Sequence, residues 1–505
     1  MPIENELNSL PNSAFTSMRR GIEKESLRAR QDGTLATTPH PAALGSPLTH
    51  AHITTDFSES QLELITGAQT SVNATLQELT HIHQVVYRAI GDEILWCASM
   101  PCNLPPDHEI PLGRYGRSNV GRAKTVYRMG LGHRYGRRMQ TISGIHYNWS
   151  IPNRSNEDYF ALVRNFRRRA WLLFYLFGAS PAVCESFVAG NPNHGLQRLS
   201  PGTLYLPHAT SLRMGRLGYQ SDAQSSLSVS YNSLADYGAS LYDALTTPYA
   251  PYEKIGLTDG NGEYRQLATS LLQIENEFYG KIRPKRRIHP GERPLHALRE
   301  RGVEYVEVRL MDLDPFSPIG ISAATCRFLD VFLLHCLLSD SPPDTPAEIA
   351  AINRNQDRVA ARGREPGLIL ERNERKLPLK EWAEELVAEC VPIGDTVDAR
   401  LGGTAYRNAV QAAAAAIDEP ESLPSARVLQ TMQRNHGGSY VRFVLAESLS
   451  HRESLLAMPL SAKVEEEMAI MARASLAKQR QIEAHDRIDF ETYRRKYLDP
   501  ALLKI

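Results

Sequence analysis

The sequence predicts an α+β protein in which a mainly antiparallel sheet is followed by a helical C-terminal portion. Two observations support this fold class. In the first two thirds of the 505 residues, segments that alternate apolar with polar residues are interleaved with segments of helical periodicity. After a polar connector at residues 339–344, which contains two prolines, the pattern is mostly helical. We therefore expect an α+β core over residues 1–338 and a helical accessory region over residues 345–505 packed on it; the two can also count as a single domain.

Composition and charge exclude several classes of protein. The chain has 57 Lys and Arg against 57 Asp and Glu, so it lacks the basic excess of a general nucleic-acid binder. The N-terminus shows no signal sequence, and the longest apolar stretches, residues 170–177 and 328–338, fall far short of the ~20 residues that a bilayer requires. We expect a cytoplasmic protein with no membrane or nucleic-acid partner, whose six cysteines stay mostly reduced.

Four predicted strands place polar side chains on one face, because successive side chains of a strand point to opposite sides. These strands cover residues 21–28, 61–66, 145–151 and 303–310. Leu62 and Leu64 belong to the apolar face of the second strand, and Tyr147 and Trp149 to that of the third. The polar faces carry, in chain order, Glu23, Glu25, Glu63, His146, Asn148, Tyr305, Glu307 and Arg309. Asp56 lies shortly before the second strand.

The polar faces predict a polynuclear metal site if the four strands belong to one sheet. A single half-polar strand is often just the solvated side of an antiparallel sheet, and that alternative stands for each segment alone. Together, however, the faces gather four carboxylates and the imidazole of His146 on one surface. Such crowding raises carboxylate pKa values unless cations neutralise the charge. Oxygen ligands in this number suit Mg2+ or Mn2+, and Mn2+ in particular accepts an imidazole.

Basic side chains supply a complementary half for an anionic ligand. Residues 275–287 combine several Lys and Arg with Asn276 and Tyr279, while Arg213 and Arg309 lie in or beside apolar segments where a charge requires a partner. The basic run at residues 283–287 can also be interpreted as a solvated patch. The chain has no complete glycine-rich phosphate loop, so a bound nucleotide would be held by metal ions and by Arg and Lys.

Helical signals are clearest in three places. Residues 74–90 follow helical spacing, which puts His81 and His83 about 200° apart around the axis and excludes them as a metal-ligand pair. Thr345 is an N-cap candidate directly after the connector. Residues 462–485 are predicted to form a long charged helix. We expect the helical final third to serve packing and subunit support, because it contains few clustered acids.

Eight sequence blocks occur in order between residues 20 and 332. They are GIEKESLR (21–28), GTLATTPHPAALGSPLTH (33–50), ITTDFSESQLELIT (53–66), MQTISGIHYNWS (139–150), LFGASPAVC (176–184), YLPHATSLRMG (205–215), LQIENEFYGKIRPKR (272–286) and VEYVEVRLMDLDPFSPIGI (303–321). In this order they resemble bacterial glutamate-cysteine ligases, a family of the glutamine-synthetase-like superfamily. The resemblance implies a curved, mainly antiparallel sheet with one catalytic face, and it weakens after the connector.

The resemblance also implies an activity. The family is ATP-dependent and joins the γ-carboxylate of L-glutamate to the amine of L-cysteine, the first step of glutathione biosynthesis. The reaction would pass through γ-glutamyl phosphate, with ATP as co-substrate and Mg2+, or Mn2+ as a substitute, as cofactor; we expect a monomer or small homo-oligomer. The alternative is a related metal-dependent carboxylate-amine ligase or phosphotransferase with a different acceptor, because the spacing of the acids does not identify the acceptor.

The family's site residues fall largely on the polar faces described above. The resemblance implies six metal ligands: Glu23, Glu25, Asp56, Glu63, His146 and Glu307. The implied catalytic residues are Glu307 and Arg309, of which Arg309 would contact the transferred phosphoryl group or a substrate carboxylate. The implied substrate pocket consists of Tyr127, Leu131, Gln140, Arg213, Tyr219 and Tyr279. The implied ATP contacts are Asn276, Arg283 and Lys285.

Overall fold

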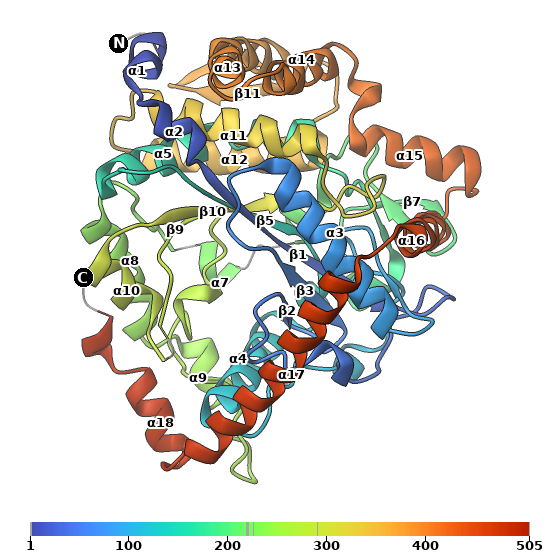
Figure 1. Ribbon diagram of the computed structural model, residues 1–505, viewed down its shortest axis with the longest axis vertical. Helices are drawn as coiled ribbons and strands as arrows, with labels where there is room; N and C mark the ends of the chain where they lie inside the picture. Colours follow the sequence, from blue (N-terminus) through green and yellow to red (C-terminus); the bar gives the residue numbers. More distant parts are fainter. Residues whose placement is uncertain (1–2, 219–221, 226, 290, 504–505) are drawn as a thin grey trace.

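The computed structural model of the chain describes residues 3–218, 222–225, 227–289 and 291–503. Within these residues the centre is one sheet of seven strands, in the order β2-β3-β1-β5-β10-β9 with β4 paired to β1 (Figure 1). The strands are β1 (Arg19–Ala29), β2 (Ile53–Thr55), β3 (Gln61–Ile65), β4 (Ile94–Leu95), β5 (Ile145–Ser150), β9 (Ile282–Lys285) and β10 (Tyr305–Met311). Neighbouring strands in this sheet run antiparallel. The predicted fold class, α+β with a mainly antiparallel sheet, is confirmed.

The strand register brings the predicted polar faces together. On β1, Glu23 pairs with His146 of β5, and Glu25 pairs with Glu63 of β3. On β10, Glu307 lies opposite residues of both β5 and β9. Because residues paired across strands share a face and side chains alternate along each strand, these five residues lie on one side of the sheet. We call this side the polar face.

Helices cover the other side, which we call the helical face. The covering helices are α3 (Val72–Ala89), α5 (Asn156–Arg169), α6 (Trp171–Phe177) and α11 (Ala323–Leu338). Ile22, Tyr147 and Val308, which alternate with the polar residues, are fully buried there. The two apolar stretches singled out in the sequence are thus α6 and the greater part of α11, and both are core helices. α3 begins two residues before its predicted start, where the side chain of Ser71 caps it.

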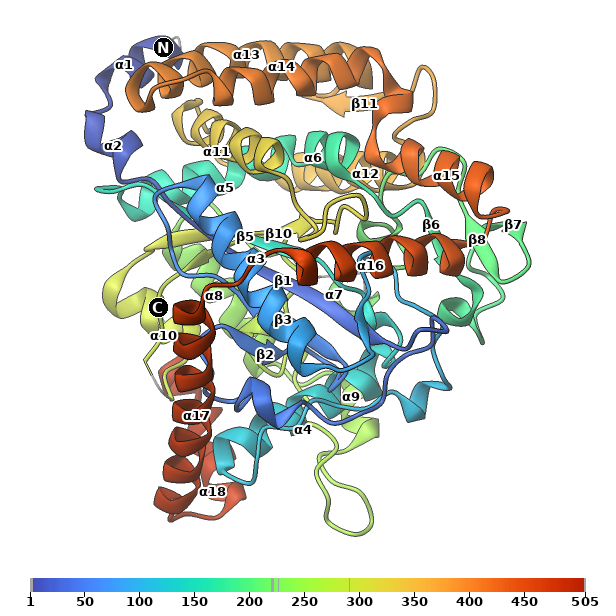
Figure 2. The ribbon, with the colours of Figure 1, turned by 45° about the vertical axis from the view of Figure 1, so that its right-hand side comes forward.

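The helical C-terminal portion follows the connector as predicted. It comprises α12 (Pro346–Arg362), the hairpin of β11 (Ile369–Arg372) and β12 (Arg375–Pro378), α13 (Leu379–Leu401), α14 (Ala405–Asp418), α15 (Pro424–Asn435), α16 (Tyr440–Ala457), α17 (Ala462–His485) and α18 (Phe490–Tyr497). The backbone N–H of Glu348 donates to the Thr345 hydroxyl at 3.2 Å, which confirms Thr345 as the N-cap of α12. α13 and α14 form an outer layer over α11 (Figures 1 and 2). The division of the chain into a core and an accessory region stays a prediction.

The remaining elements lie around the sheet. They are α1 (Ile3–Ser9), α2 (Asn12–Thr16), α4 (Asn119–Tyr135), β6 (Ala182–Cys184), β7 (Gln197–Ser200), β8 (Thr203–Tyr205), α7 (Asp222–Ser225), α8 (Leu234–Thr246), α9 (Ala250–Ile255) and α10 (Pro294–Arg301). α17 and α18 form an arm that runs past α4 (Figures 1 and 2), where the backbone N–H of Asn119 donates to Asp486 at 2.5 Å. Among the described residues, no helix combines the length and apolar character of a membrane span. All six cysteines are free thiols and buried.

Candidate functional site

The centre of the polar face is a cluster of acids around one histidine. Glu23, Glu63 and His146 each offer a ligand atom, and these atoms lie within 4.8 Å of one another. The imidazole of His146 lies between two acids of β1, with Nδ1 3.1 Å from Glu23 Oε2 and Nε2 3.6 Å from Glu25 Oε1. The side chain of Asn148 donates to Glu23 Oε1 at 3.0 Å. The alternation on β1, β3 and β5 therefore brings four of the six predicted ligands into one group.

Burial and like charge shift the pKa values of this group. Burial, followed by the charge of Asp56, raises the pKa of Glu25 to about 8. Burial, followed by Glu23, Asp56 and Glu25, raises the pKa of Glu63 well above its usual value. Burial and Arg309 lower the pKa of His146, so its ring is neutral and has a lone pair to offer. The cluster is thus an acid-rich site that protons or added cations must compensate. Asp56, the fifth predicted ligand, is close enough to raise the pKa values of both Glu25 and Glu63, so it lies beside the cluster.

Cations gather around the sixth predicted ligand, Glu307. Its carboxylate lies 3.2 Å from Lys285 Nζ, 3.1 Å from Arg309 Nη1 and 3.9 Å from Arg283 Nη1. Burial acts to raise the pKa of Glu307, but the charges of Lys285 and Arg309 outweigh it, so the pKa is held well below its usual value. Three cationic side chains around one ionised acid leave positive charge to spare for a phosphate.

The donor set of the cluster fits a hard divalent cation. Carboxylate oxygens from β1 and β3 and one neutral imidazole from β5 are ligands that Mg2+ and Mn2+ accept, and no thiolate is among them. A cation would also relieve the repulsion that raises the pKa values of Glu25 and Glu63. The residues therefore fit a resident divalent metal ion.

The predicted substrate residues come from the loops and helix that border the polar face. Gln140 donates to the Tyr279 hydroxyl at 2.8 Å. Tyr127 lies near Tyr279, and burial together with nearby Glu277 raises its pKa. Leu131 is buried one turn further along α4. Tyr219 lies outside the described residues.

Arg213 reaches the site from the turn at Leu212–Met214 and lies deep in the molecule. Its guanidinium donates to the backbone carbonyl of Arg309 at 2.8 Å and lies 3.9 Å from Asp312. Gly144 permits this approach, because a Cβ there would lie 2.0 Å from Arg213 Nη2. The backbone N–H of Gly144 also donates to Glu25 Oε2 at 2.8 Å. The absence of a side chain at this glycine thus joins Arg213 to the acid cluster.

The predicted ATP residues lie at the end of the face beyond Glu307. Arg283 and Lys285 are two positions apart on β9, so they share a face of the strand, and both contact Glu307. Asn276 is exposed, and its backbone carbonyl accepts a hydrogen bond from Arg283 Nη2 at 3.0 Å. The structure therefore brings the three residues together on one side of the acid cluster. Their role as ATP contacts stays a prediction.

Two cations on α4 were missed in the sequence. Lys124 is near Glu63 and Asp56, and burial together with Arg128 lowers its pKa to about 8. Arg128 donates to the backbone carbonyl of Asp56. Both residues follow helical spacing with Tyr127 and Leu131, so they share the face of α4 that borders the site. Once Tyr127 and Leu131 are assigned to the pocket, the same helical spacing predicts that Lys124 and Arg128 also face the site.

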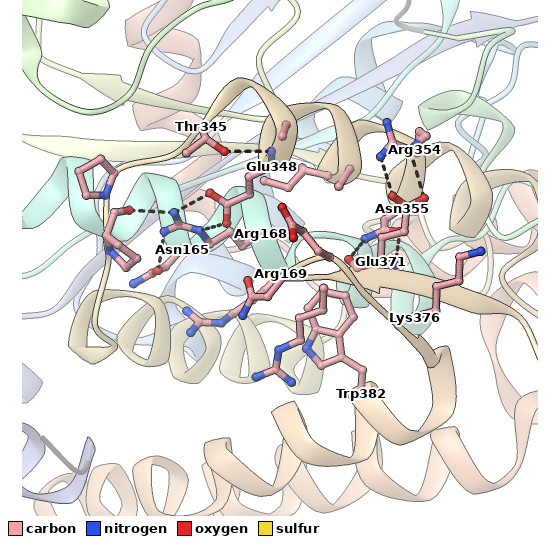
Figure 3. A pocket seen from close by; sticks show the side chains of 18 of the residues that line it. Asn165, Arg168, Arg169, Thr345, Glu348, Arg354, Asn355, Glu371, Lys376 and Trp382 are labelled. Atoms are coloured by element: carbon pink, nitrogen blue, oxygen red, sulfur yellow. Dashed lines mark hydrogen bonds and ion pairs between the residues drawn. The ribbon is translucent and has the colours of Figure 1, made fainter.

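A cavity elsewhere in the molecule provides a contrast (Figure 3). It has a volume of about 660 Å3 and lies between the connector, α12 and the β11–β12 hairpin. Arg168 meets Glu348 at 2.6 Å and Arg354 meets Glu371 at 2.5 Å in its wall. These opposite charges are already matched, so this wall does not show the crowding of like charges that marks the polar face.

Comparisons with known proteins extend over nearly the whole chain. The sequence profile of the glutamate-cysteine ligase family matches residues 5–359. A glutamate-cysteine ligase of Alcanivorax borkumensis is 46% identical over 97% of this chain and 97% of its own length. One of Azotobacter vinelandii is 49% identical over 94% of this chain and 93% of its own.

The same likeness is found among solved structures. The crystal structure of glutamate-cysteine ligase from Francisella tularensis in complex with AMP has a TM-score of 0.91 and 36% identity to this chain. It covers 96% of this chain and 98% of its own. The similarity thus continues through the helical portion, where the sequence blocks had weakened.

Proposed function

The chain belongs to the glutamate-cysteine ligase family, and we propose that its polar face is where ATP drives the joining of L-glutamate to L-cysteine. The enzyme is an ATP-dependent ligase, and its reaction is the first step of glutathione biosynthesis. The observation that carries the placement is the meeting of three groups on one surface. These are the acids around His146, the cations around Glu307 and the aromatic pocket around Tyr279.

The cationic end of the face binds the nucleotide in this proposal. Lys285 and Arg283 hold phosphate oxygens of ATP, since both side chains reach the site and stay charged beside Glu307. Asn276 is exposed at the rim, where it contacts the rest of the nucleotide. Arg309, 3.1 Å from Glu307, is placed to donate to the phosphoryl group as negative charge develops on it. Removing one such preorganised donor typically costs about 2.7–4 kcal/mol of transition-state stabilisation.

The acid cluster holds Mg2+, for which Mn2+ can substitute. The proposed ligands are Glu23, Glu25, Asp56, Glu63, His146 and Glu307. When bound, the metal neutralises phosphate oxygens and makes the phosphoryl group easier to transfer. The chain's own part is to keep four of these acids together on β1, β3 and β10 and to hold the His146 ring by its contact with Glu23.

The proposed chemistry activates the glutamate side chain before the amine attacks it. A free carboxylate is a poor acyl donor, so we propose that the γ-carboxylate first takes the γ-phosphoryl group of ATP. ADP leaves in that step. The cysteine amine then attacks the γ-carbonyl carbon and gives up a proton, and phosphate leaves. Arg213 lies between the acid cluster and the backbone of Arg309, where it can pair with a carboxylate of an amino-acid substrate.

The pocket beside the acids receives cysteine. Tyr127, Leu131, Gln140 and Tyr279 provide a small, largely aromatic wall with one hydrogen-bonding pair, and Tyr219 completes the proposed set. The cysteine thiol is recognised there and takes no part in the reaction. Because such a pocket separates ligands that differ by one group by only about 1–3 kcal/mol, 2-aminobutyrate should be accepted in place of cysteine. We propose a cytoplasmic monomer or small homo-oligomer.

A coupled assay of ADP release tests this function. The enzyme is given ATP, glutamate and a panel of amines, with and without Mg2+. ADP release that requires glutamate, cysteine and Mg2+ together supports the proposal. Equal release with unrelated amines would instead indicate the alternative acceptor that the acids alone leave open, and release without any amine would indicate a phosphotransferase.

A further inference from the structure

One buried carboxylate next to the site is used by neither the acid cluster nor the cationic end. Glu277 lies in the turn Glu275–Glu277, between exposed Asn276 and the pocket residue Tyr279. Only 1% of it is exposed. It belongs to a single turn of 3-10 helix outside the sheet, so strand pairing does not fix its neighbours, and other contacts must hold Asn276 and Tyr279 in place.

The contacts of Glu277 tie this turn to α4. Its Oε1 accepts from Arg134 Nη1 at 2.9 Å and from the Tyr135 hydroxyl at 2.8 Å, and the ion pair with Arg134 is fully buried. Its Oε2 accepts from the backbone N–H of Gln273 at 2.6 Å. Both donors on α4 lie in its last turn, one turn after Leu131. A single carboxylate therefore joins the helix of the proposed cysteine pocket to the turn of the proposed nucleotide contact.

The same contacts extend to both sides of the site. The ring of Tyr135 packs edge-on against that of Tyr279, with centroids 5.7 Å apart. Gln273 donates to the backbone carbonyl of Tyr127 at 3.3 Å. On the other side of Glu277, the carbonyl of Asn276 accepts from Arg283 at 3.0 Å. The cysteine side and the nucleotide side are thus both within one contact of this carboxylate.

We infer that Glu277 is a positioning residue, which fixes the 273–279 segment so that Tyr279 faces the cysteine pocket and Asn276 faces the nucleotide. This inference rests on the proposed function of those two residues. Glu277 touches none of the proposed metal ligands in the contacts described, so its effect should fall on substrate binding and leave the metal requirement alone.

The test is Glu277→Gln, measured by the KM for cysteine, the KM for ATP and the half-saturating Mg2+ concentration. Glu277 accepts three hydrogen bonds and donates none, so an amide in its place must turn an N–H toward at least one donor. We expect the KM for cysteine to rise at least about tenfold and that for ATP about threefold, because small displacements of positioning groups have large kinetic effects. The half-saturating Mg2+ concentration should change by less than about twofold.

Glu275→Gln is the matched control. Glu275 is a buried carboxylate in the same turn, but it pairs with Arg293 at 2.5 Å and accepts from the backbone N–H of Leu295, both outside the site. A merely structural role for Glu277 would give the two variants the same kinetic change in proportion to their loss of thermal stability. We expect the control to lose stability while its KM for cysteine stays within about twofold of the wild type.

Tyr135→Phe keeps the inference testable if Glu277→Gln does not fold. It removes one of the three donors and leaves the ion pair in place, so we expect a KM for cysteine about threefold higher. Unchanged KM values in the folded variants, or a change in the Mg2+ requirement instead, would overturn the inference.

ATP binding to the wild type and to the variant is measured in parallel, without cysteine. A wild type that lacks cysteine-dependent turnover would overturn the proposed function, whereas equal ATP affinity of wild type and variant would overturn the role of Glu277.

Discussion

On the polar face of the sheet, Glu23, Glu25 and Glu63 crowd around one neutral histidine, whereas on the helical face a single acid meets a matching charge. There, Asp330 of α11 lies 3.0 Å from Arg20 of β1 and accepts hydrogen bonds from two tyrosines, one in β5 and one in α14. Glu25 and His146 in the first group are buried, as are Arg20 and Asp330 in the second, and both groups use β1. The comparison teaches that burial alone does not mark a functional site; the crowding of like charges is what distinguishes the polar face.

The largest expected effect comes from the polar face. Glu307→Gln should reduce turnover at least about 100-fold with the fold intact, because it removes a proposed metal ligand and leaves Lys285 and Arg309 without their carboxylate. Glu304→Gln is the control, since that exposed acid lies just before the same strand, pairs with Arg286 and accepts a hydrogen bond from the backbone N–H of Arg287. Near-normal turnover of the first variant at saturating Mg2+ would count against the assignment of the site.

The second prediction concerns the helical face. Asp330→Ala should lower the free energy of unfolding by about 3–5 kcal/mol, because Arg20 is left buried without its partner. Urea unfolding measures this loss. Turnover of the remaining folded enzyme should stay within about tenfold of the wild type, because no proposed ligand is removed.

Removing the charge of one acid on the polar face should not destabilise the protein as Asp330→Ala does. Without metal, Glu63→Gln should leave the free energy of unfolding unchanged or raise it by about 1 kcal/mol at alkaline pH, because it relieves like-charge crowding. If both variants lost stability equally, the contrast between the two faces would be wrong.

The third prediction is a pH dependence of the metal-free enzyme. The pKa of Glu25 rises on folding from its ordinary 4.5 to about 8, and that of Glu63 rises also. Between these values the folded state binds more protons than the unfolded chain, so its stability falls as the pH rises toward about 8. Mg2+ should reduce this fall, because it takes the place of the protons. Thermal unfolding at several pH values, with and without Mg2+, measures both trends; a metal-free stability that increases over this window contradicts the account.

The smallest expected effect is at the cysteines. Burial raises the pKa of Cys97 to about 12, and Cys102 is buried with a raised pKa as well. Buried thiols with raised pKa values are inert, so Cys97→Ser and Cys102→Ser, tested separately, should keep activity within about twofold. Loss of activity in a folded variant would show that a thiol contributes to the reaction.

Local periodicity was enough to predict much of the polar face. Alternation in β1 fixes Glu23 and Glu25 on one side whatever the strand pairs with, and it does the same for His146 in β5 and Glu307 in β10. It could not show which strands are neighbours. The resemblance to a family supplied that step, and the register then brought the acids together.

What the sequence could not predict depends on contacts between distant segments. Glu277 looks like any acid in a charged turn, and only the fold shows that Arg134 and Tyr135 surround it. Asp330 interrupts an apolar stretch, but its partner Arg20 lies more than 300 residues earlier in the sequence. Such pairings follow from packing rather than from local pattern, so periodicity carries no trace of them.

The central claim is that the crowded acids of the polar face hold divalent cations. Titration of the metal-free enzyme with Mn2+, followed by electron paramagnetic resonance, tests it most directly. The account predicts that the enzyme binds Mn2+ with release of protons near neutral pH, and that Glu63→Gln weakens this binding while Asp330→Asn does not. The claim would be contradicted if the enzyme did not bind Mn2+, or if the wild type and Glu63→Gln bound it equally strongly.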